Sequence, residues 1–245
     1  MISVRLYGRI GNQMWQIAAC IAVAIRNKTD FNIPDRTLNP KLWKTYFTHF
    51  PRRIPMGGQI WREPTHAYHP IPIKKNLILD GYFQSDKYFL DVKEEVFAHF
   101  GMRWTPIEGV AIHVRRGDYL TLQDKHPVVS LDYLNSAIRY FWDLGQRKFT
   151  FFSDDIEWCK EHFKGDNYYF SEGKTEKQDI ELISCHQHQV LSASSFSAWG
   201  AMLNRNPDKI VIAPAKWFGD GNAHLPTRDM YCEGWMKMNQ NGDFV

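Results

Sequence analysis

The stretch from Val110 to Leu120 has the sequence VAIHVRRGDYL and places charged side chains directly after a run of apolar ones. The apolar run predicts a buried strand that ends at two adjacent arginines. A planar guanidinium offers forked donors that match the oxygens of a phosphate group. Gly117 would let the backbone turn sharply. Asp118 would hold an arginine in place or accept a hydrogen bond from a ligand hydroxyl. We interpret this strand end as a candidate anion site.

Two further predicted strands also end in polar residues. The strand at 149–152 leads into Ser153, Asp154 and Asp155, and the strand at 189–192 leads into the sequence ASSFS, which opens a predicted helix. Hydroxyls and free N–H groups at a helix start favour an anion, and either aspartate would accept from a base edge or a ribose. Ligands of open parallel sheets lie beyond the carboxyl ends of the strands, so we expect all three strand ends at one edge. Together they describe a pocket for a nucleotide diphosphate.

Each motif also has a purely structural interpretation. RRGD alone is compatible with a solvated turn, and both SDD and SSFS are good helix N-caps. Arg-Gly-Asp as an adhesion signal would need an exposed flexible loop, whereas here the tripeptide directly follows a predicted buried strand. The glycine-containing sequence GRIGN near the N-terminus is usually just a turn. His66, His69 and His126 are expected to be ordinary loop residues.

The predicted elements that position these motifs follow an α/β order. A strand at 2–7, a loop with Gly8, Gly11 and Asn12, and an apolar helix at 13–27 form a first unit. Residues 28–75 show no sustained period and are predicted as loops and short helices around a ligand. Residues 101–109 are predicted as a linker. Beyond it, strands alternate with helices up to a last clear strand at 210–213, which predicts a parallel sheet. We therefore expect two α/β domains, 1–104 and 105–245, with the tail 226–245 packing back.

Composition and missing motifs exclude several classes of protein. The chain has 245 residues and a formal charge of +3, too mild for a nucleic-acid-binding protein. The four cysteines form no CxxC pair, and the histidines show no HExxH spacing, so no metal site is predicted. Neither a GxxxxGK[ST] nor a GxSxG motif is present. No signal peptide or apolar run long enough to span a membrane is visible, so a cytoplasmic protein is expected.

The motifs taken together resemble those of glycosyltransferase family 11, the α-1,2-fucosyltransferases. HVRRGDY followed by SSFS is far more specific than either motif alone. The matching segments span residues 6–218 and follow the family's order: GRIGNQMWQIAAC, GYFQSDKYF, AIHVRRGDYL, FFSDDIEWCK, LSASSFSAWGAMLN and IVIAPAKWF.

The resemblance implies a GT-B architecture with two facing Rossmann-like α/β domains. It implies GDP-fucose as the donor, bound mainly by the C-terminal domain, and a galactose-ended glycan as the acceptor on the N-terminal side. It further implies inversion at the fucose anomeric carbon, with no metal or other cofactor. An inverting transfer leaves negative charge on GDP, which paired arginines and a helix N-terminus stabilise.

The same resemblance assigns expected roles to individual residues. Arg115 takes the main diphosphate-binding and catalytic role, Asp118 and Arg116 support it, and His113 lies near the nucleotide. The remaining positions line the donor or face the cleft: Ser194, Ser195, Phe196 and Ser197 on the phosphate and fucose side, Asp154 and Asp155 near the donor, and Gly11, Asn12 and Gln13 from the N-terminal domain.

Some features depart from the family pattern and leave alternatives open. Arg9 replaces a small residue, Ala198 stands where the family commonly has Trp, and the chain is short for the family, with compact acceptor-side segments. The catalytic base is Asp118, a histidine or a water-mediated route. A related transferase with another nucleotide sugar or linkage, and a non-catalytic glycan-binding protein on the same scaffold, are the alternative functions.

Overall fold

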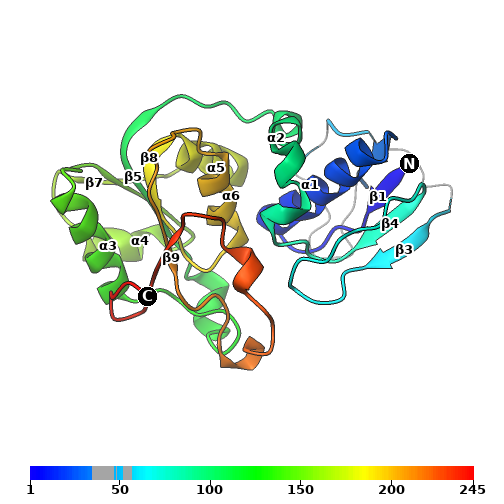
Figure 1. The fold of residues 1–245 in the computed structure, drawn as a ribbon. Helices are drawn as coiled ribbons and strands as arrows, with labels where there is room; N and C mark the ends of the chain where they lie inside the picture. The colour runs from blue at the N-terminus through cyan, green and yellow to red at the C-terminus, as the bar shows by residue number, and fades with distance from the viewer. Residues whose placement is uncertain (35–46, 48, 52–56) are drawn as a thin grey trace. The chain divides into compact units, whose positions relative to one another are not determined.

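The computed structural model describes residues 1–34, 47, 49–51 and 57–245. Within them the chain forms two compact units (Figure 1). The first comprises Met1–Met102 together with Leu225–Cys232, and the second comprises Arg103–His224 together with Glu233–Val245. The first unit is therefore discontinuous in sequence, because a short return segment late in the chain belongs to it.

The first unit contains a four-stranded parallel sheet in the order β2-β1-β4-β3. Its strands are β1 (Ile2–Val4), β2 (Phe31–Asn32), β3 (Gln59–Arg62) and β4 (Leu77–Asp80). Two helices accompany the sheet, α1 (Ile10–Arg26) and α2 (Lys93–Phe100). The prediction of loops and short helices over 28–75 is wrong at β2 and β3; its part over 35–46, 48 and 52–56 lies outside the described residues. β2 is very short and β3 is mostly exposed, so neither carries an apolar pattern that predicts a strand.

Helix α1 begins three residues earlier than predicted, at Ile10. Gly11 and Asn12 therefore lie in its first turn, and their assignment to a loop is wrong. The sharp turn before α1 is made by Gly8, whose φ is +68°. A Cβ at Gly8 would lie 2.4 Å from Asn12 Nδ2, so the close approach also requires glycine.

The second unit contains a six-stranded parallel sheet in the order β10-β9-β8-β5-β6-β7. The predicted α/β order is confirmed, apart from the unpredicted last strand. The strands are β5 (Ile107–Val114), β6 (Phe149–Ser153), β7 (Tyr168–Phe170), β8 (His186–Val190), β9 (Val211–Pro214) and β10 (Met236–Met238). β5 begins inside the predicted linker, where Gly109 has a φ of +103° and the register with β8 shifts. β10 was missed because its three residues, MKM, form no apolar run.

Helices cover both faces of this second sheet. They are α3 (Leu131–Asp143), α4 (Ile156–His162), α5 (Glu176–Cys185) and α6 (Ser195–Leu203). Alternate residues of β5 point to opposite faces. Val110, Ile112 and Val114 pack in the cluster formed with α3, whereas Ala111 packs with Ile183 on the other side. No helix among the described residues is long and apolar enough to cross a membrane.

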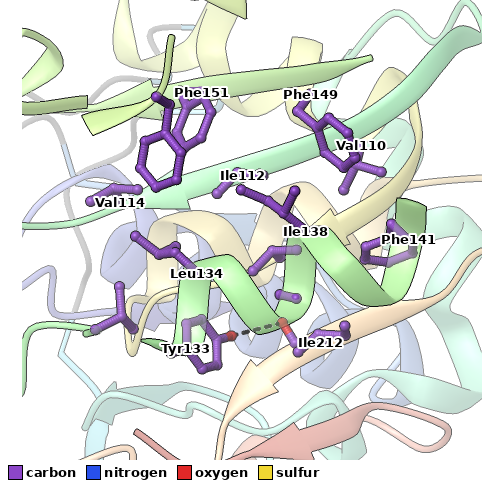
Figure 2. Packing of buried hydrophobic residues seen from close by; sticks show 14 of the residues in the cluster. Val110, Ile112, Val114, Tyr133, Leu134, Ile138, Phe141, Phe149, Phe151 and Ile212 are labelled. Carbon is purple, nitrogen blue, oxygen red and sulfur yellow. Dashed lines mark hydrogen bonds between the residues drawn. The ribbon is translucent and has the colours of Figure 1, made fainter. Parts of the chain in front are cut away.

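Tyr133 of α3 lies in the main core and reaches Ile212 of β9 with its hydroxyl (Figure 2). It is fully buried among aliphatic and aromatic side chains. Its hydroxyl lies 2.8 Å from the Leu191 carbonyl oxygen and 3.2 Å from that of Ile212, and donates to them. These contacts fix the helix against β9 and against the residue that directly follows β8.

We expect Tyr133→Phe to lower the free energy of unfolding by about 1–2 kcal/mol, because a buried hydrogen bond is lost while the ring still fills its place. Urea denaturation measures this change. Tyr169→Phe is the matched control, since Tyr169 is 47% exposed on the edge strand β7. Equal stabilities of the two variants would contradict the prediction.

Candidate functional site

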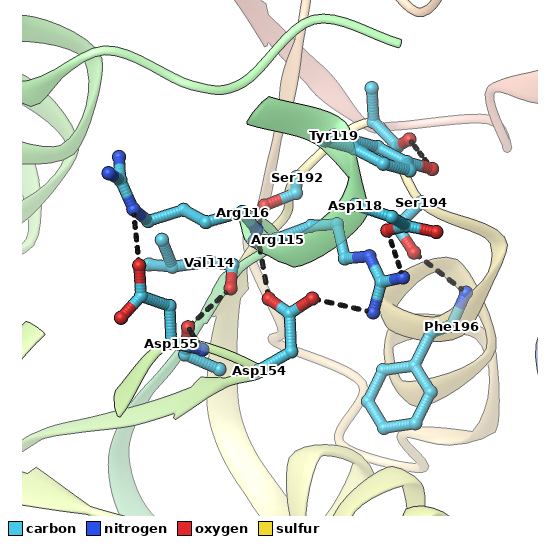
Figure 3. Close-up of polar contacts among 12 residues, drawn as sticks. Val114, Arg115, Arg116, Asp118, Tyr119, Asp154, Asp155, Ser192, Ser194 and Phe196 are labelled. Atoms are coloured by element: carbon cyan, nitrogen blue, oxygen red, sulfur yellow. Dashed lines mark hydrogen bonds and ion pairs between the residues drawn. The ribbon is translucent and has the colours of Figure 1, made fainter. Parts of the chain in front are cut away.

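The three polar strand ends meet at one edge of the second sheet, as predicted. β8, β5 and β6 are immediate neighbours and parallel, so their carboxyl ends lie together. Figure 3 shows the side chains that gather there, with Arg115 placed between Asp154 and Asp118. The site is built entirely from residues of the second unit.

Two serines hold the end of β5 in place from its neighbouring strands. The Ser192 hydroxyl accepts from the Arg115 backbone N–H at 2.9 Å and donates to the His113 carbonyl at 2.7 Å. On the other side, Ser153 donates to the Val114 carbonyl at 2.7 Å. Ser192 was not among the predicted site residues. The only signal in the sequence is a hydroxyl at the last position of the strand predicted at 189–192.

Asp154 holds the two arginines together. Its Oδ2 pairs with Arg115 Nη1 at 2.8 Å, and its Oδ1 accepts from the Arg116 backbone N–H at 2.9 Å. Arg115 also pairs with Asp118 through Nη2. A Cβ on Gly117 would lie 2.2 Å from Asp154 Oδ2, so glycine is required for this approach. The arginine side chain is thereby fixed, with only 15% of its surface exposed.

Asp155 performs the corresponding role for Arg116. Its Oδ2 lies 3.0 Å from Arg116 Nε, and the guanidinium carbon lies 4.0 Å from the centre of the Trp158 ring. Asp155 is at the same time the N-cap of α4, where it accepts from the Trp158 backbone N–H at 3.4 Å. The N-cap interpretation of this aspartate is therefore correct, and the cap also orients an arginine.

The segment between β8 and α6 supplies the predicted helix start. Ser194 is the N-cap of α6 and accepts from the Phe196 backbone N–H at 3.3 Å. Ser195 is the first helical residue. Ser197 is fully buried and donates to the carbonyls of Ser192 and Ser194, so its hydroxyl bonds within its own turn. The first turn carries no acidic side chain that would neutralise the positive end of the helix dipole.

His113 is buried behind the arginines, with 5% of its surface exposed. Its ring stacks on that of Phe196 at a centroid distance of 5.1 Å. Burial, together with the positive charge of Arg115, lowers the pKa of His113 to about 3. Its Nδ1 has no hydrogen-bond partner among the described residues. The ring is therefore neutral at physiological pH and a weak base, with one polar atom unsatisfied by the protein.

We expect His113 to stay neutral at pH 5, where an exposed histidine is mostly protonated. Below pH 6.5 the unfolded chain takes up a proton that the folded chain accepts only near pH 3, so His113 makes the free energy of unfolding fall as the pH is lowered between these values. Imidazole chemical shifts against pH measure the first effect. For the second, stability should fall less steeply from pH 7 to 5 in His113→Phe than in the wild type. Equal slopes would contradict the assignment.

The other predicted donor or cleft residues lie in the first unit. Asn12 Oδ1 accepts from Gln84 Nε2 at 2.8 Å, and Gln13 Nε2 donates to the Gly8 carbonyl at 3.2 Å. Gly11 and Gln13 are buried in α1. The structure thus joins the glycine-containing turn to the GYFQ segment through Gln84, a contact that sequence reasoning did not single out.

No group of three or more metal-ligating side chains occurs in the described part of the chain. The expectation that the activity needs no metal stays a prediction.

The two parallel α/β units define a fold of the GT-B class of glycosyltransferases. The structure is similar to the crystal structure of the fucosyltransferase NodZ from Bradyrhizobium, with a TM-score of 0.51 at 12% sequence identity. The similarity covers 82% of this chain and 93% of that one. At this identity it establishes the fold alone.

Residues 1–239 match the model of glycosyl transferase family 11, and the chain belongs to this family. It is 38% identical over 129 residues to the O-antigen biosynthesis glycosyltransferase WbnK of Escherichia coli, over 49% of this chain and 43% of that protein. It is 32% identical to an alpha-1,2-colitosyltransferase of Escherichia coli, over 65% and 62% of the two chains. It is 25% identical to galactoside alpha-(1,2)-fucosyltransferase 2 of Oryctolagus cuniculus, over 87% and 69%. The first two matches thus span less than two thirds of those relatives.

Proposed function

We propose that this protein transfers L-fucose from GDP-fucose to the 2-hydroxyl of a terminal galactose on a glycan, without a metal ion. The acceptor oxygen attacks the anomeric carbon of fucose from the face opposite the diphosphate. The bond from that carbon to the β-phosphate oxygen breaks, GDP leaves, and the configuration inverts. The hydroxyl proton passes to a base or to water. In this proposal the second unit binds the donor and the first unit binds the acceptor.

The observation that carries the proposal is the set of fixed hydrogen-bond donors gathered at one sheet edge, two guanidinium groups and a helix N-terminus. Arg115, Arg116 and the N-terminus of α6 all lie at the carboxyl ends of β5 and β8. Negative charge develops on the leaving diphosphate, and fixed guanidinium groups and helix N–H donors stabilise such charge without reorganising. The neutral His113 ring beside them has an unsatisfied Nδ1 that a bound donor would complete.

The relatives support the linkage more strongly than the sugar. Both the colitosyltransferase of Escherichia coli and the rabbit fucosyltransferase carry an alpha-1,2 linkage in their names. The colitosyltransferase has the higher identity, which favours nucleotide-linked colitose as the second candidate donor. A non-catalytic glycan-binding protein on this scaffold is the third candidate, and the completely assembled arginine cluster argues against it.

The proton of the acceptor hydroxyl passes to Asp118 or to water in this proposal. His113 is a poor choice, because its pKa is lowered to about 3 by burial and by Arg115. Asp118 pairs with Arg115 and thereby helps to orient it. Because its side chain is 45% exposed, it also stays a candidate base alongside water.

Calorimetric titration of GDP-fucose, GDP and UDP-galactose into the whole protein in EDTA tests the donor. We expect GDP and GDP-fucose to bind and UDP-galactose to bind at least tenfold more weakly. The product formed on a galactose-ended glycan is then analysed by NMR, where an α-configured fucose on the galactose 2-position is expected. Equal binding of UDP-galactose, or glycan binding with no GDP released from any donor, would overturn the proposal.

A further inference from the structure

The carboxylates of the site restrain the two arginines only in the plane of each guanidinium. Asp118 and Asp154 form ion pairs with the terminal nitrogens of Arg115, and Asp155 forms one with Nε of Arg116. Hydrogen bonds of this kind lie in the guanidinium plane, so they leave the group free to tilt about its in-plane contacts. A site that must hold a diphosphate in one orientation needs a restraint on the faces as well.

Aromatic rings supply such a restraint on one face of each guanidinium. The guanidinium carbon of Arg115 lies 5.2 Å from the centre of the Tyr119 ring, and that of Arg116 lies 4.0 Å from the centre of the Trp158 ring. The Tyr119 hydroxyl also donates to the Ala193 carbonyl at 3.3 Å, just before the N-cap of α6 (Figure 3). Tyr119 thus connects the arginine loop to the helix that completes the site.

A histidine is stacked on each of these two rings. His126 stacks on Tyr119 at 4.9 Å with an interplanar angle of 19°, and His162 stacks on Trp158 at 4.2 Å and 27°. The same three groups therefore occur at both arginines: a guanidinium, an aromatic ring that it contacts, and an imidazole that stacks on that ring. The two histidines come from unrelated segments, the turn after the arginine loop and the last turn of α4.

Each histidine is itself fixed. His162 Nδ1 lies 2.8 Å from the Trp158 carbonyl oxygen and donates to it. His126 donates its backbone N–H to the Leu122 carbonyl at 2.8 Å and contacts the Phe218 ring edge-on at 6.2 Å. Its turn is anchored by Gly219, which donates to the Lys125 carbonyl at 3.0 Å. A Cβ on Gly219 would lie 2.2 Å from the Asp124 carbonyl oxygen, so the two segments touch backbone to backbone.

We propose that His126 and His162 are positioning residues of the diphosphate site, each fixing one arginine through the aromatic ring that both of them contact. The expected effect on the affinity for GDP rests on the proposed function. The geometric part is independent of any ligand, because it concerns the order of the two guanidinium groups in the free protein. Burial lowers the pKa of His126, which keeps a second positive charge away from Arg115.

The test compares four variants of the whole protein: His126→Ala, His126→Phe, His162→Ala and His162→Phe. A phenylalanine ring keeps the stack, whereas alanine removes it. Alanine at either position should weaken GDP binding by roughly 5- to 20-fold, and phenylalanine should keep it within about twofold of the wild type. His224→Ala is the matched control, because His224 is exposed and belongs to neither stack. Thermal unfolding of each variant separates a loss of positioning from a loss of fold.

The ligand-free readout is the Nε–Hε NMR signal of each arginine. His126→Ala should broaden or shift the Arg115 signal and leave that of Arg116, and His162→Ala should do the reverse. Wild-type protein that shows no GDP binding would refute the proposed donor, while these signals would still decide the role of the stacks. Unchanged signals in the alanine variants would overturn the inference. So would unchanged GDP affinity, or phenylalanine variants as weak as the alanine ones.

Discussion

Arg115→Ala is expected to lower kcat/KM for fucosyl transfer by about 10²–10³-fold, the usual cost of removing a donor aimed at developing charge. Arg115 is the arginine held by two carboxylates and a ring, so its orientation is the most completely fixed in the site. A loss of this size should appear both in GDP affinity and in the rate of transfer at saturating donor, because the diphosphate carries more negative charge as it leaves. Calorimetry and single-turnover rates measure the two effects separately.

Arg205→Ala is the matched control for this variant. Arg205 is exposed and lies in the connection between α6 and β9, which enters the sheet from the edge opposite the site. Its removal should change neither measurement by more than about twofold. Arg115→Lys keeps the charge but loses the forked donors, so it should recover only a small part of the activity. Transfer by Arg115→Ala at a rate near that of the wild type would refute the role of the arginine.

Asp154→Asn is expected to weaken GDP binding about tenfold, although it removes a negative charge from an anion site. Two effects compete. Removing a partly exposed carboxylate should favour an anion by at most about 1 kcal/mol. Against this, an asparagine that keeps its oxygen for the Arg116 N–H turns its own NH₂ group toward Arg115, where donor faces donor. Because the misplaced arginine costs more than the removed charge gains, the net effect is a loss.

Asp166→Asn is the control, since it removes a charge from an exposed position of the same unit. Gly117→Ala provides a second route to the same defect, because its Cβ would occupy the place of Asp154 Oδ2. Both Asp154→Asn and Gly117→Ala should therefore weaken GDP binding while the thermal midpoint moves little. Tighter binding of GDP by Asp154→Asn would show that charge outweighs orientation at this site.

The sequence predicts those parts of the fold in which long apolar runs alternate with helical patterns. β5, β6 and β8 are largely buried strands in the middle of a sheet. Charged or hydroxyl side chains follow at their carboxyl ends, where the apolar core stops. The α/β order therefore predicts that their carboxyl ends share one edge, whereas only the structure shows that the three strands are neighbours. β2, β3 and β10 escaped prediction because they are short and carry no apolar run, unlike the equally short β1 and β9, so tertiary pairing decides their conformation.

The roles of the site residues depend on contacts that no local pattern contains. Sequence alone left Asp154 and Asp155 as ligand contacts or helix caps, whereas the structure shows both as anchors of arginines 38 and 39 residues away. Ser197 illustrates the reverse case, since a hydroxyl in a promising motif is turned into the backbone of its own turn. His126 was expected to be an ordinary loop residue, because nothing nearby in sequence indicates that its ring stacks on Tyr119.

The return of residues 225–232 to the first unit limits how this protein can be dissected. Asp229, which is 5% exposed, accepts from the Tyr68 backbone N–H at 2.9 Å and from Lys87 Nζ at 2.6 Å. A fragment ending at Met102 would lack that carboxylate and the buried Met230 beside it. Chimeras that exchange the first unit between family members must therefore carry two pieces of chain, residues 1–102 and residues 225–232.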